Sequence, residues 1–162
     1  MKRLVLMRHA KSDWGDPALP DHARPLNERG RRSATALGDW LRAMGALPDQ
    51  ILCSSSERTQ ETCARLNLPL APELHDALYL AEAPGMLRLL RGATGSQVLM
   101  LGHNPGIAEF AARLVAAPPD HDRFHDYPTG ATLVARFDID DWADVSPGTG
   151  TALHFVIPRD LI

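Results

Sequence analysis

Three short apolar runs in this sequence are bounded by turn residues and separated by stretches with helical spacing: residues 4–7, 51–53 and 98–101. Such a run predicts a buried strand, and strands separated by helices are usually parallel. Cationic or imidazole side chains follow the runs: Arg8 and His9, then Arg58, then His103. Because the carboxyl ends of parallel strands lie at one edge of a sheet, we expect these side chains to meet there. A site with this charge favours an anionic ligand.

The rest of the pattern predicts one domain over residues 1–162. Further strands are expected at 132–137 and 153–157, and helices at 27–44, 84–91 and after residue 103. Helices that connect successive strands cover both faces of a sheet. The fold class is therefore a three-layer α/β/α sandwich whose central sheet is mostly parallel, with five or six strands.

The charge balance argues against a nucleic-acid or membrane partner. A net charge of -3 at pH 7 has the wrong sign for binding a phosphate backbone or an anionic lipid surface. Only four apolar residues precede Arg8, which is too few for the core of a signal peptide, so we expect a cytoplasmic protein. We expect the two cysteines, Cys53 and Cys63, to be reduced core residues.

The segments after the predicted strands carry loop and helix-capping residues. Residues 11–25 hold three prolines and predict a long ordered loop near the site. Any of the three serines at 54–56 can cap the helix that carries Arg58. Asn104, followed by a proline, can cap the next helix and thereby place His103 at its N-terminus. An arginine in the first turn of a helix interacts unfavourably with the helix dipole, at a cost of about 0.3–1 kcal/mol. An anion bound close by would offset this cost.

Three motifs occur in order, each after a predicted strand: residues 6–10 (LMRHA), 54–62 (SSSERTQET) and 102–106 (GHNPG). Together they resemble the histidine phosphatase (phosphoglycerate mutase-like) superfamily. Ala10, residues 24–27 (RPLN) with Gly30, and residues 127–131 (YPTGA) are similar to its SixA-type phosphohistidine phosphatase branch. The resemblance covers about the whole chain and implies a phosphoglycerate mutase-like fold.

The resemblance implies that His9 accepts the phosphoryl group and that Arg8, Arg58 and His103 surround the phosphate. We add Asn104 to the phosphate-binding set. A phosphoryl group in transfer spreads negative charge over its oxygens, which guanidinium groups stabilise without a metal ion or cofactor. To attack, His9 must be neutral with one ring nitrogen free and the other held, as a backbone carbonyl would do. His103 is expected to donate to a phosphate oxygen, as imidazole or imidazolium. Water then removes the phosphoryl group from His9 in a second step.

The proton donor to the leaving group is the least defined residue. Larger members of the superfamily use an acidic residue, for which the candidates are Glu82 and Asp13. We assign the role to Glu82, although a glutamate at a helix start is commonly a solvated charge. Without a firm acid, phosphohistidine or aryl phosphates are favoured, because a phosphoramidate leaves as neutral imidazole once its ring is protonated.

Other polar residues have less specific interpretations. Three residues that follow His9 can border the pocket: Lys11, Ser12 and Trp14. Three residues of a proline-rich loop are interpreted as solvated, because no fourth ligand occurs at a metal-binding spacing: His121, Asp122 and His125.

Two other functions fit the same residues. One is a small-molecule phosphomonoesterase or a phosphoglycerate mutase-like enzyme, although a mutase usually needs extra substrate-binding segments and this chain is short. The other is a non-catalytic module that binds phosphate or a phosphoprotein, against which both His9 and His103 argue, because arginines alone would serve binding. The expected partner is thus a phosphorylated protein carrying phosphohistidine, or a small phosphate ester. No oligomeric state is predicted.

Overall fold

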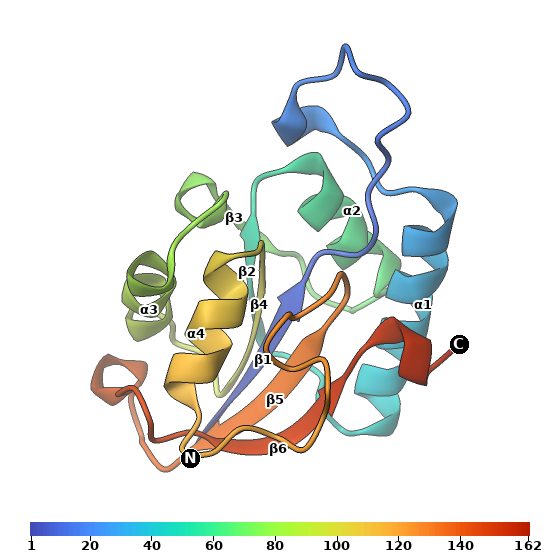
Figure 1. Cartoon of the computed structure of the whole chain (residues 1–162). Helices are drawn as coiled ribbons and strands as arrows, with labels where there is room; N and C mark the ends of the chain where they lie inside the picture. The colour runs from blue at the N-terminus through green and yellow to red at the C-terminus, as the bar shows by residue number, and fades with distance from the viewer.

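The computed structural model describes all residues, 1–162, and its centre is a six-stranded sheet in the order β3-β2-β4-β1-β5-β6 (Figure 1). The strands are β1 (Lys2–Arg8), β2 (Gln50–Ser54), β3 (Glu73–His75), β4 (Gln97–Gly102), β5 (Thr132–Phe137) and β6 (Thr151–Val156). The first four pair in parallel, whereas β5 runs antiparallel to both β1 and β6. The sheet is therefore mixed, and β1 lies between a parallel and an antiparallel neighbour.

Two helical layers cover the sheet, as the sequence predicted. The helices are α1 (Glu28–Ala43), α2 (Glu57–Arg65), α3 (Ala83–Arg91) and α4 (Gly106–Leu114). Figure 1 shows α1 and α2 on one face and α3 and α4 on the other. Because successive side chains of a strand point to opposite faces, β1 divides its residues between the layers. Leu4 and Leu6 pack in the cluster under α3 and α4, and Val5 and Met7 in the cluster under α1 and α2.

The segment between β1 and α1 is the loop expected at residues 11–25, and it projects beyond the carboxyl ends of the central strands (Figure 1). Gly30 allows the first turn of α1 to pack closely against the first residues of this loop. A Cβ at Gly30 would lie 2.0 Å from the Lys11 carbonyl oxygen, which also accepts a hydrogen bond of 3.0 Å from the Asn27 backbone N–H. The side chain of Asn27 accepts from the Gly30 N–H at 2.8 Å, as expected of a cap. The start of α1 thus holds the backbone just after His9.

The prediction that Asn104 caps the next helix is wrong. The helix α4 begins at Gly106, and Pro105 occupies the capping position after a cis Asn104–Pro105 peptide bond. The Asn104 amide donates instead to the carbonyl oxygens of Asp126 and Tyr127, at 2.9 Å and 3.0 Å. The sequence did not reveal these acceptors, because they lie on a loop that is distant along the chain.

Cys53 and Cys63 are both free and buried, which confirms their assignment to the core. None of the helices has the length and apolar character needed to cross a membrane.

Candidate active site

The carboxyl ends of the central strands bring the predicted residues together. Arg8 ends β1 and pairs in register with Gly102, which ends β4, so His9 and His103 follow neighbouring strands. Their ring centroids lie 5.2 Å apart. Arg58, in the first turn of α2, places its Nη2 3.4 Å from His103 Nδ1.

These side chains surround a cavity of about 180 Å³. The cavity is lined by Arg8, His9, Lys11, Ser12, Trp14, Arg24, Arg58, Leu80, His103, Asn104 and Thr129. Lys11, Ser12 and Trp14 therefore border the pocket as the sequence suggested. The lining holds cations and imidazoles but no carboxylate, so it attracts an anion.

His9 is held in one orientation by the backbone. Its Nδ1 lies 2.7 Å from the Ala10 carbonyl oxygen, and its side chain is 6% exposed. No protein group bonds its Nε2. Burial lowers the pKa of His9 to about 3, and the hydrogen bond to the Ala10 carbonyl opposes that shift, whereas the charge of Arg8 adds to it. The result is a neutral imidazole whose Nδ1 carries the proton and whose Nε2 has a free lone pair.

His103 is fixed by a hydroxyl on the neighbouring strand. Its Nε2 lies 2.7 Å from Ser54 Oγ, and its ring is 2% exposed. Burial, followed by the charge of Arg58, lowers the pKa of His103 to about 3, so the empty pocket favours the neutral ring. A bound anion would shift the pKa in the opposite direction. Because a hydroxyl can donate or accept, Ser54 is compatible with either tautomer and with the imidazolium.

Arg58 is positioned by Asp21, which sequence reasoning did not identify. Arg58 Nη1 donates to the Asp21 carbonyl oxygen at 2.8 Å, and Nη2 donates to Asp21 Oδ2 at 3.0 Å. The Tyr79 hydroxyl donates to the same carboxylate oxygen. The hydrogen bond from Tyr79, followed by those from Arg58 and Arg24, holds the pKa of Asp21 at about 2. Asp21 therefore stays ionised and keeps the Arg58 guanidinium over the cavity.

Arg24 is a second residue to which the sequence assigned no role of its own. It is 6% exposed, donates to Ser12 Oγ at 2.7 Å and places its Cζ 3.5 Å from the centroid of the Trp14 ring. In the sequence, the only indication that Arg24 has a role was its place in residues 24–27, one of the segments that carry the family resemblance. Arg24 connects the two ends of the projecting loop above the cavity.

Two arginine nitrogens at the cavity have no partner in the protein. Arg8 Nη1 donates to the Tyr127 carbonyl at 3.2 Å, whereas the Nε atoms of Arg8 and Arg58 are buried and unbonded. A buried donor left without a partner costs about 1–3 kcal/mol, and more where the group is charged. Because both residues line the cavity, the negative charge of a bound phosphate would stabilise the two guanidinium groups.

The side-chain amide of Asn104 has no free N–H to offer a ligand in this cavity. Its side-chain nitrogen is used on the two loop carbonyls described above, and its Oδ1 is buried without a partner. Asn104 does line the cavity, so its place in the phosphate-binding set stays a prediction, to which its side-chain nitrogen gives no support. Its amide instead holds the loop that contains Tyr127 against the strand end.

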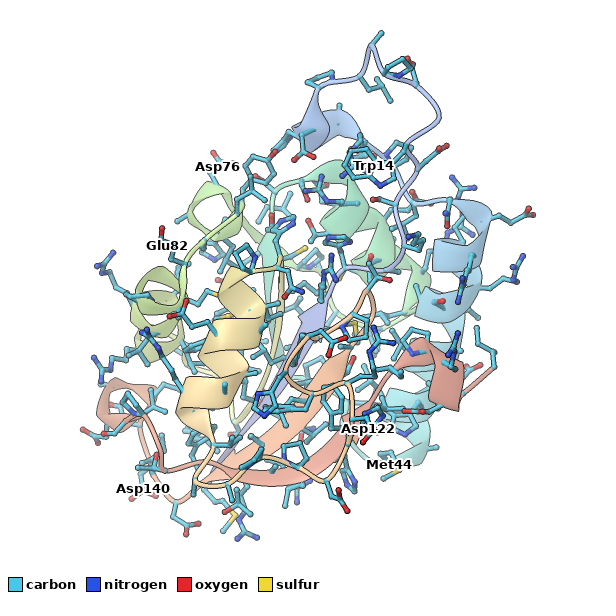
Figure 2. The ribbon with its side chains drawn as sticks, viewed as in Figure 1. Trp14, Met44, Asp76, Glu82, Asp122 and Asp140 are labelled. Atoms are coloured by element: carbon cyan, nitrogen blue, oxygen red, sulfur yellow. The ribbon has the colours of Figure 1, made fainter.

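Neither acidic candidate lines the cavity. Glu82 is exposed and immediately precedes α3. Figure 2 shows Glu82 near the start of that helix and Trp14 at the projecting loop, well apart from it. Of the segment just before α3, Leu80 lines the cavity and Glu82 does not. Asp13 is exposed, and its Oδ1 accepts from the Gly15 N–H at 2.7 Å. The role of Glu82 as proton donor stays a prediction, and the lining gives it no support.

The three residues considered as metal ligands lie outside the cavity. His121 Nε2 is 2.9 Å from Asp160 Oδ2, and no group of three or more His, Cys, Asp or Glu side chains is arranged to hold a metal ion. His121 is thus held by a hydrogen bond to Asp160 on the surface rather than left free in solvent.

Comparisons with known proteins agree with this geometry. The model of the histidine phosphatase superfamily (branch 1) matches residues 4–84. An uncharacterized protein of Mycobacterium tuberculosis is 35% identical over 161 residues, which is 94% of this chain and 100% of the relative. A proposed phosphohistidine phosphatase SixA from Nakamurella multipartitia superimposes with a TM-score of 0.86 at 30% identity, over 97% of this chain and 96% of that one. The fold, at 12% identity, is also that of a phosphoserine phosphatase from Entamoeba histolytica, with a TM-score of 0.70 over the whole of both chains.

Proposed function

Because the chain belongs to the histidine phosphatase superfamily (branch 1), we propose that it is a SixA-like phosphatase that removes the phosphoryl group from phosphohistidine on a protein. The observation that carries the proposal is the unbonded Nε2 of a neutral His9 in a cavity lined by Arg8, Arg58 and His103 and by no carboxylate. These groups supply a nucleophile and positive charge without needing a metal ion.

In the first step His9 Nε2 attacks phosphorus and forms a P–N bond, while the bond from phosphorus to the leaving group breaks. The Ala10 carbonyl keeps the proton on Nδ1 and thereby leaves the Nε2 lone pair free. The guanidinium groups of Arg8 and Arg58 bind the equatorial oxygens, whose negative charge is spread out in the transition state. His103 Nδ1 accepts from Arg58 Nη2 in the empty pocket, and it donates to a phosphate oxygen when the ring carries a proton on Nδ1, as the other tautomer or as imidazolium, both of which Ser54 allows.

In the second step a water oxygen attacks the phosphoryl group on His9, the P–N bond breaks, and the water protons pass to the released phosphate and solvent. His9 returns to its neutral form with the proton still on Nδ1. The same cations serve both steps because each step transfers the same phosphoryl group at the same place.

The cavity lining bears on the leaving group. An alkoxide is a poor leaving group unless an acid protonates it, whereas imidazole leaves from a protonated phosphohistidine ring as a neutral molecule. Since no carboxylate lines the cavity, the enzyme is suited to phosphohistidine more than to alkyl phosphate esters. This is the reason to prefer a protein phosphohistidine substrate over a small phosphomonoester.

Trapping the intermediate tests the proposal. After brief incubation with a labelled phosphoramidate, the wild-type protein should carry an acid-labile, base-stable phosphoryl group, and His9→Ala should carry none and lose about a thousandfold or more in turnover. His125→Ala is the matched control, because His125 is exposed and does not line the cavity. An unimpaired His9→Ala variant would rule the scheme out.

A substrate panel separates the remaining alternatives. The rate on a phosphohistidine peptide should exceed the rates on a phosphoserine peptide and on an alkyl phosphomonoester, both of which release an alkoxide, in the wild-type protein and in Glu82→Gln alike. Equal rates on the alkyl ester and on phosphohistidine would favour the small-molecule phosphomonoesterase. A single burst of phosphate without turnover would indicate the non-catalytic binding module.

A further inference from the structure

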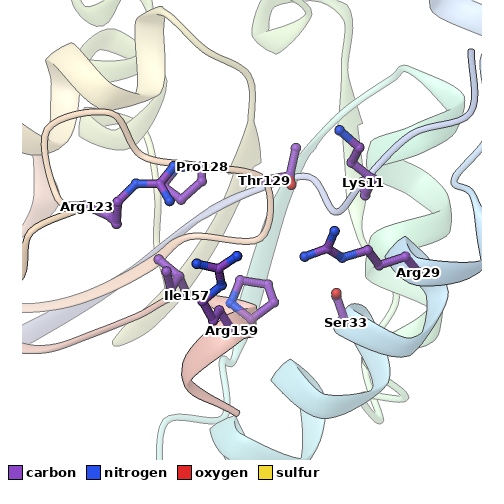
Figure 3. Close-up of a pocket in the computed structure, with 9 residues that line it drawn as sticks. Lys11, Arg29, Ser33, Arg123, Pro128, Thr129, Ile157 and Arg159 are labelled. Carbon is purple, nitrogen blue, oxygen red and sulfur yellow. The ribbon is translucent and has the colours of Figure 1, made fainter. Parts of the chain in front are cut away.

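A second cavity, of about 190 Å³, adjoins the candidate active site. It shares Lys11 and Thr129 with that site, so these two residues form the boundary between the cavities. Its other lining residues are Arg29, Ser33, Arg123, Pro128, Ile157, Pro158 and Arg159. We refer to this cavity as the cationic pocket, because Lys11, Arg29, Arg123 and Arg159 line it and no acidic residue does (Figure 3).

Most of these cations are not neutralised within the protein. Arg123 donates from Nε to Asp126 Oδ2 at 2.6 Å, but Lys11, Arg29 and Arg159 form no ion pair or side-chain hydrogen bond. Figure 3 shows the Arg29 and Arg159 side chains pointing toward one another across the pocket. Like charges so placed repel each other, and an anion between them would remove the repulsion.

The positions of these residues along the chain make their convergence more specific. Arg29 lies in the first turn of α1, where a cation opposes the helix dipole. Arg159 lies in the short 3₁₀ turn Pro158–Asp160, near the other end of the chain. Because Gly30 packs closely against the Lys11 carbonyl oxygen, the adjacent Arg29 is brought near the backbone of Lys11. Elements far apart in sequence therefore converge on one pocket in a chain whose net charge is -3.

The active-site cavity is small, and this limits where the rest of a substrate can lie. A protein substrate is far larger than a cavity of about 180 Å³, so most of it must lie on the adjoining surface. The cationic pocket is on that surface, directly beyond Lys11 and Thr129.

We propose that the cationic pocket binds a carboxylate that flanks the phosphohistidine of the protein substrate, so that the enzyme prefers phosphohistidine in an acidic sequence or surface. This inference rests on the proposed function, because the phosphohistidine is the group that places the carboxylate beside the pocket. Arg29 and Arg159 are specificity residues in this arrangement, and neither contacts the phosphoryl group.

Steady-state kinetics on matched peptides test the proposal. One phosphohistidine peptide carries Asp and Glu near the phosphorylated residue, a second carries Asn and Gln at the same positions, and phosphoramidate serves as the substrate without flanking groups. In Arg29→Gln and Arg159→Gln the KM for the acidic peptide should rise about threefold each, and about tenfold in the double variant, with kcat unchanged. KM for the neutral peptide and for phosphoramidate should stay the same.

Arg88→Gln is the matched control, because Arg88 is an exposed arginine of α3 that lines neither cavity and forms no ion pair. It should leave all three KM values unchanged. The preference of the wild-type protein for the acidic peptide should also weaken as salt is raised from about 0.05 M to 0.5 M, since exposed charges are screened. Equal KM values for the two peptides in the wild-type protein, or equal shifts for both peptides in the variants, would overturn the inference.

Failure of the proposed function gives a different result. If the wild-type protein does not turn over phosphoramidate or the neutral peptide, the phosphatase assignment fails. Calorimetric titration with stable phosphonate analogues of the two peptides then tests the pocket by itself. Tighter binding of the acidic analogue that is lost in the double variant supports the pocket, and equal binding of the two analogues rejects it.

Discussion

The two buried imidazoles should make the protein less stable in mild acid. Burial lowers the pKa of both His9 and His103 to about 3, whereas a histidine of the unfolded chain has a pKa of about 6.5. Below pH 6.5 the unfolded state therefore binds more protons than the folded state, so the free energy of unfolding falls as the pH falls. At pH 5 each imidazole lowers that free energy by about 2 kcal/mol, and the two together by about 4 kcal/mol, relative to neutral pH.

The pH range in which stability is lost distinguishes these imidazoles from Asp21, although both kinds of group lose stability as the pH falls. Asp21 has a pKa of about 2, so the stability that it contributes is present above about pH 4 and is lost only in stronger acid. A loss of stability between pH 7 and pH 5 therefore reports the buried imidazoles rather than Asp21.

Urea denaturation at pH 7 and at pH 5 measures the effect through linear extrapolation. Replacing His9 or His103 by Gln should remove about half of the loss, because Gln has no proton to bind. His125→Gln is the matched control, since it removes an exposed imidazole outside the cavity. The reasoning is refuted if His9→Gln and His103→Gln lose as much stability on acidification as the wild-type protein does.

Two further substitutions test how the cavity is built. Asp21→Asn removes the charge that positions Arg58, so kcat/KM should fall about three- to tenfold while stability changes by less than about 1 kcal/mol, because the Asp21 side chain is 44% exposed. Gly30→Ala should lower the free energy of unfolding by about 2 kcal/mol or more, since its Cβ would lie 2.0 Å from the Lys11 carbonyl oxygen; urea denaturation measures this loss.

Asp21→Asn and Gly30→Ala each have a matched control variant. Asp16→Asn changes another acidic residue of the projecting loop, whose Oδ1 contacts only the Ala18 N–H, and kcat/KM should be unchanged. Gly85→Ala adds a Cβ within a helix where nothing lies within 4 Å, and should stabilise the protein by about 0.5–1 kcal/mol. Equal effects of Asp21→Asn and Asp16→Asn, or of Gly30→Ala and Gly85→Ala, would contradict the assigned roles.

The sequence predicted the part of the structure that depends on local pattern. Apolar runs of strand length, each ended by turn residues, indicated the strands that carry Arg8, His9 and His103 at their ends. A parallel arrangement of those strands then implied that the side chains meet, and Arg58 followed from its distance past the end of β2. The backbone carbonyl that holds His9 Nδ1 was expected from the chemistry, and the structure supplies it at Ala10.

The parts that the sequence did not reveal depend on loops that pack against distant elements. Asp21 comes from the projecting loop and contacts Arg58 from 37 residues along the chain, a pairing that no periodicity encodes. Asn104 has the right residue type for a cap, but the carbonyls of a later loop use its amide. The site of Glu82 could not be inferred either, because whether a residue before a helix points into a cavity depends on the tilt of that helix.

The charges around the active site explain why binding and stability should be linked. Two buried guanidinium nitrogens have no acceptor, and two imidazoles are kept neutral by burial and by neighbouring arginines, so the empty cavity is an unfavourable arrangement of positive groups. A bound phosphate supplies negative charge, which raises the pKa of His103 and offsets part of this penalty. Because a ligand that binds only the folded state stabilises it, inorganic phosphate should raise Tm in a concentration-dependent way, which a thermal-shift titration measures. The burial that keeps His9 and His103 neutral, to which the neighbouring arginines add, thus also makes the unliganded protein sensitive to acid.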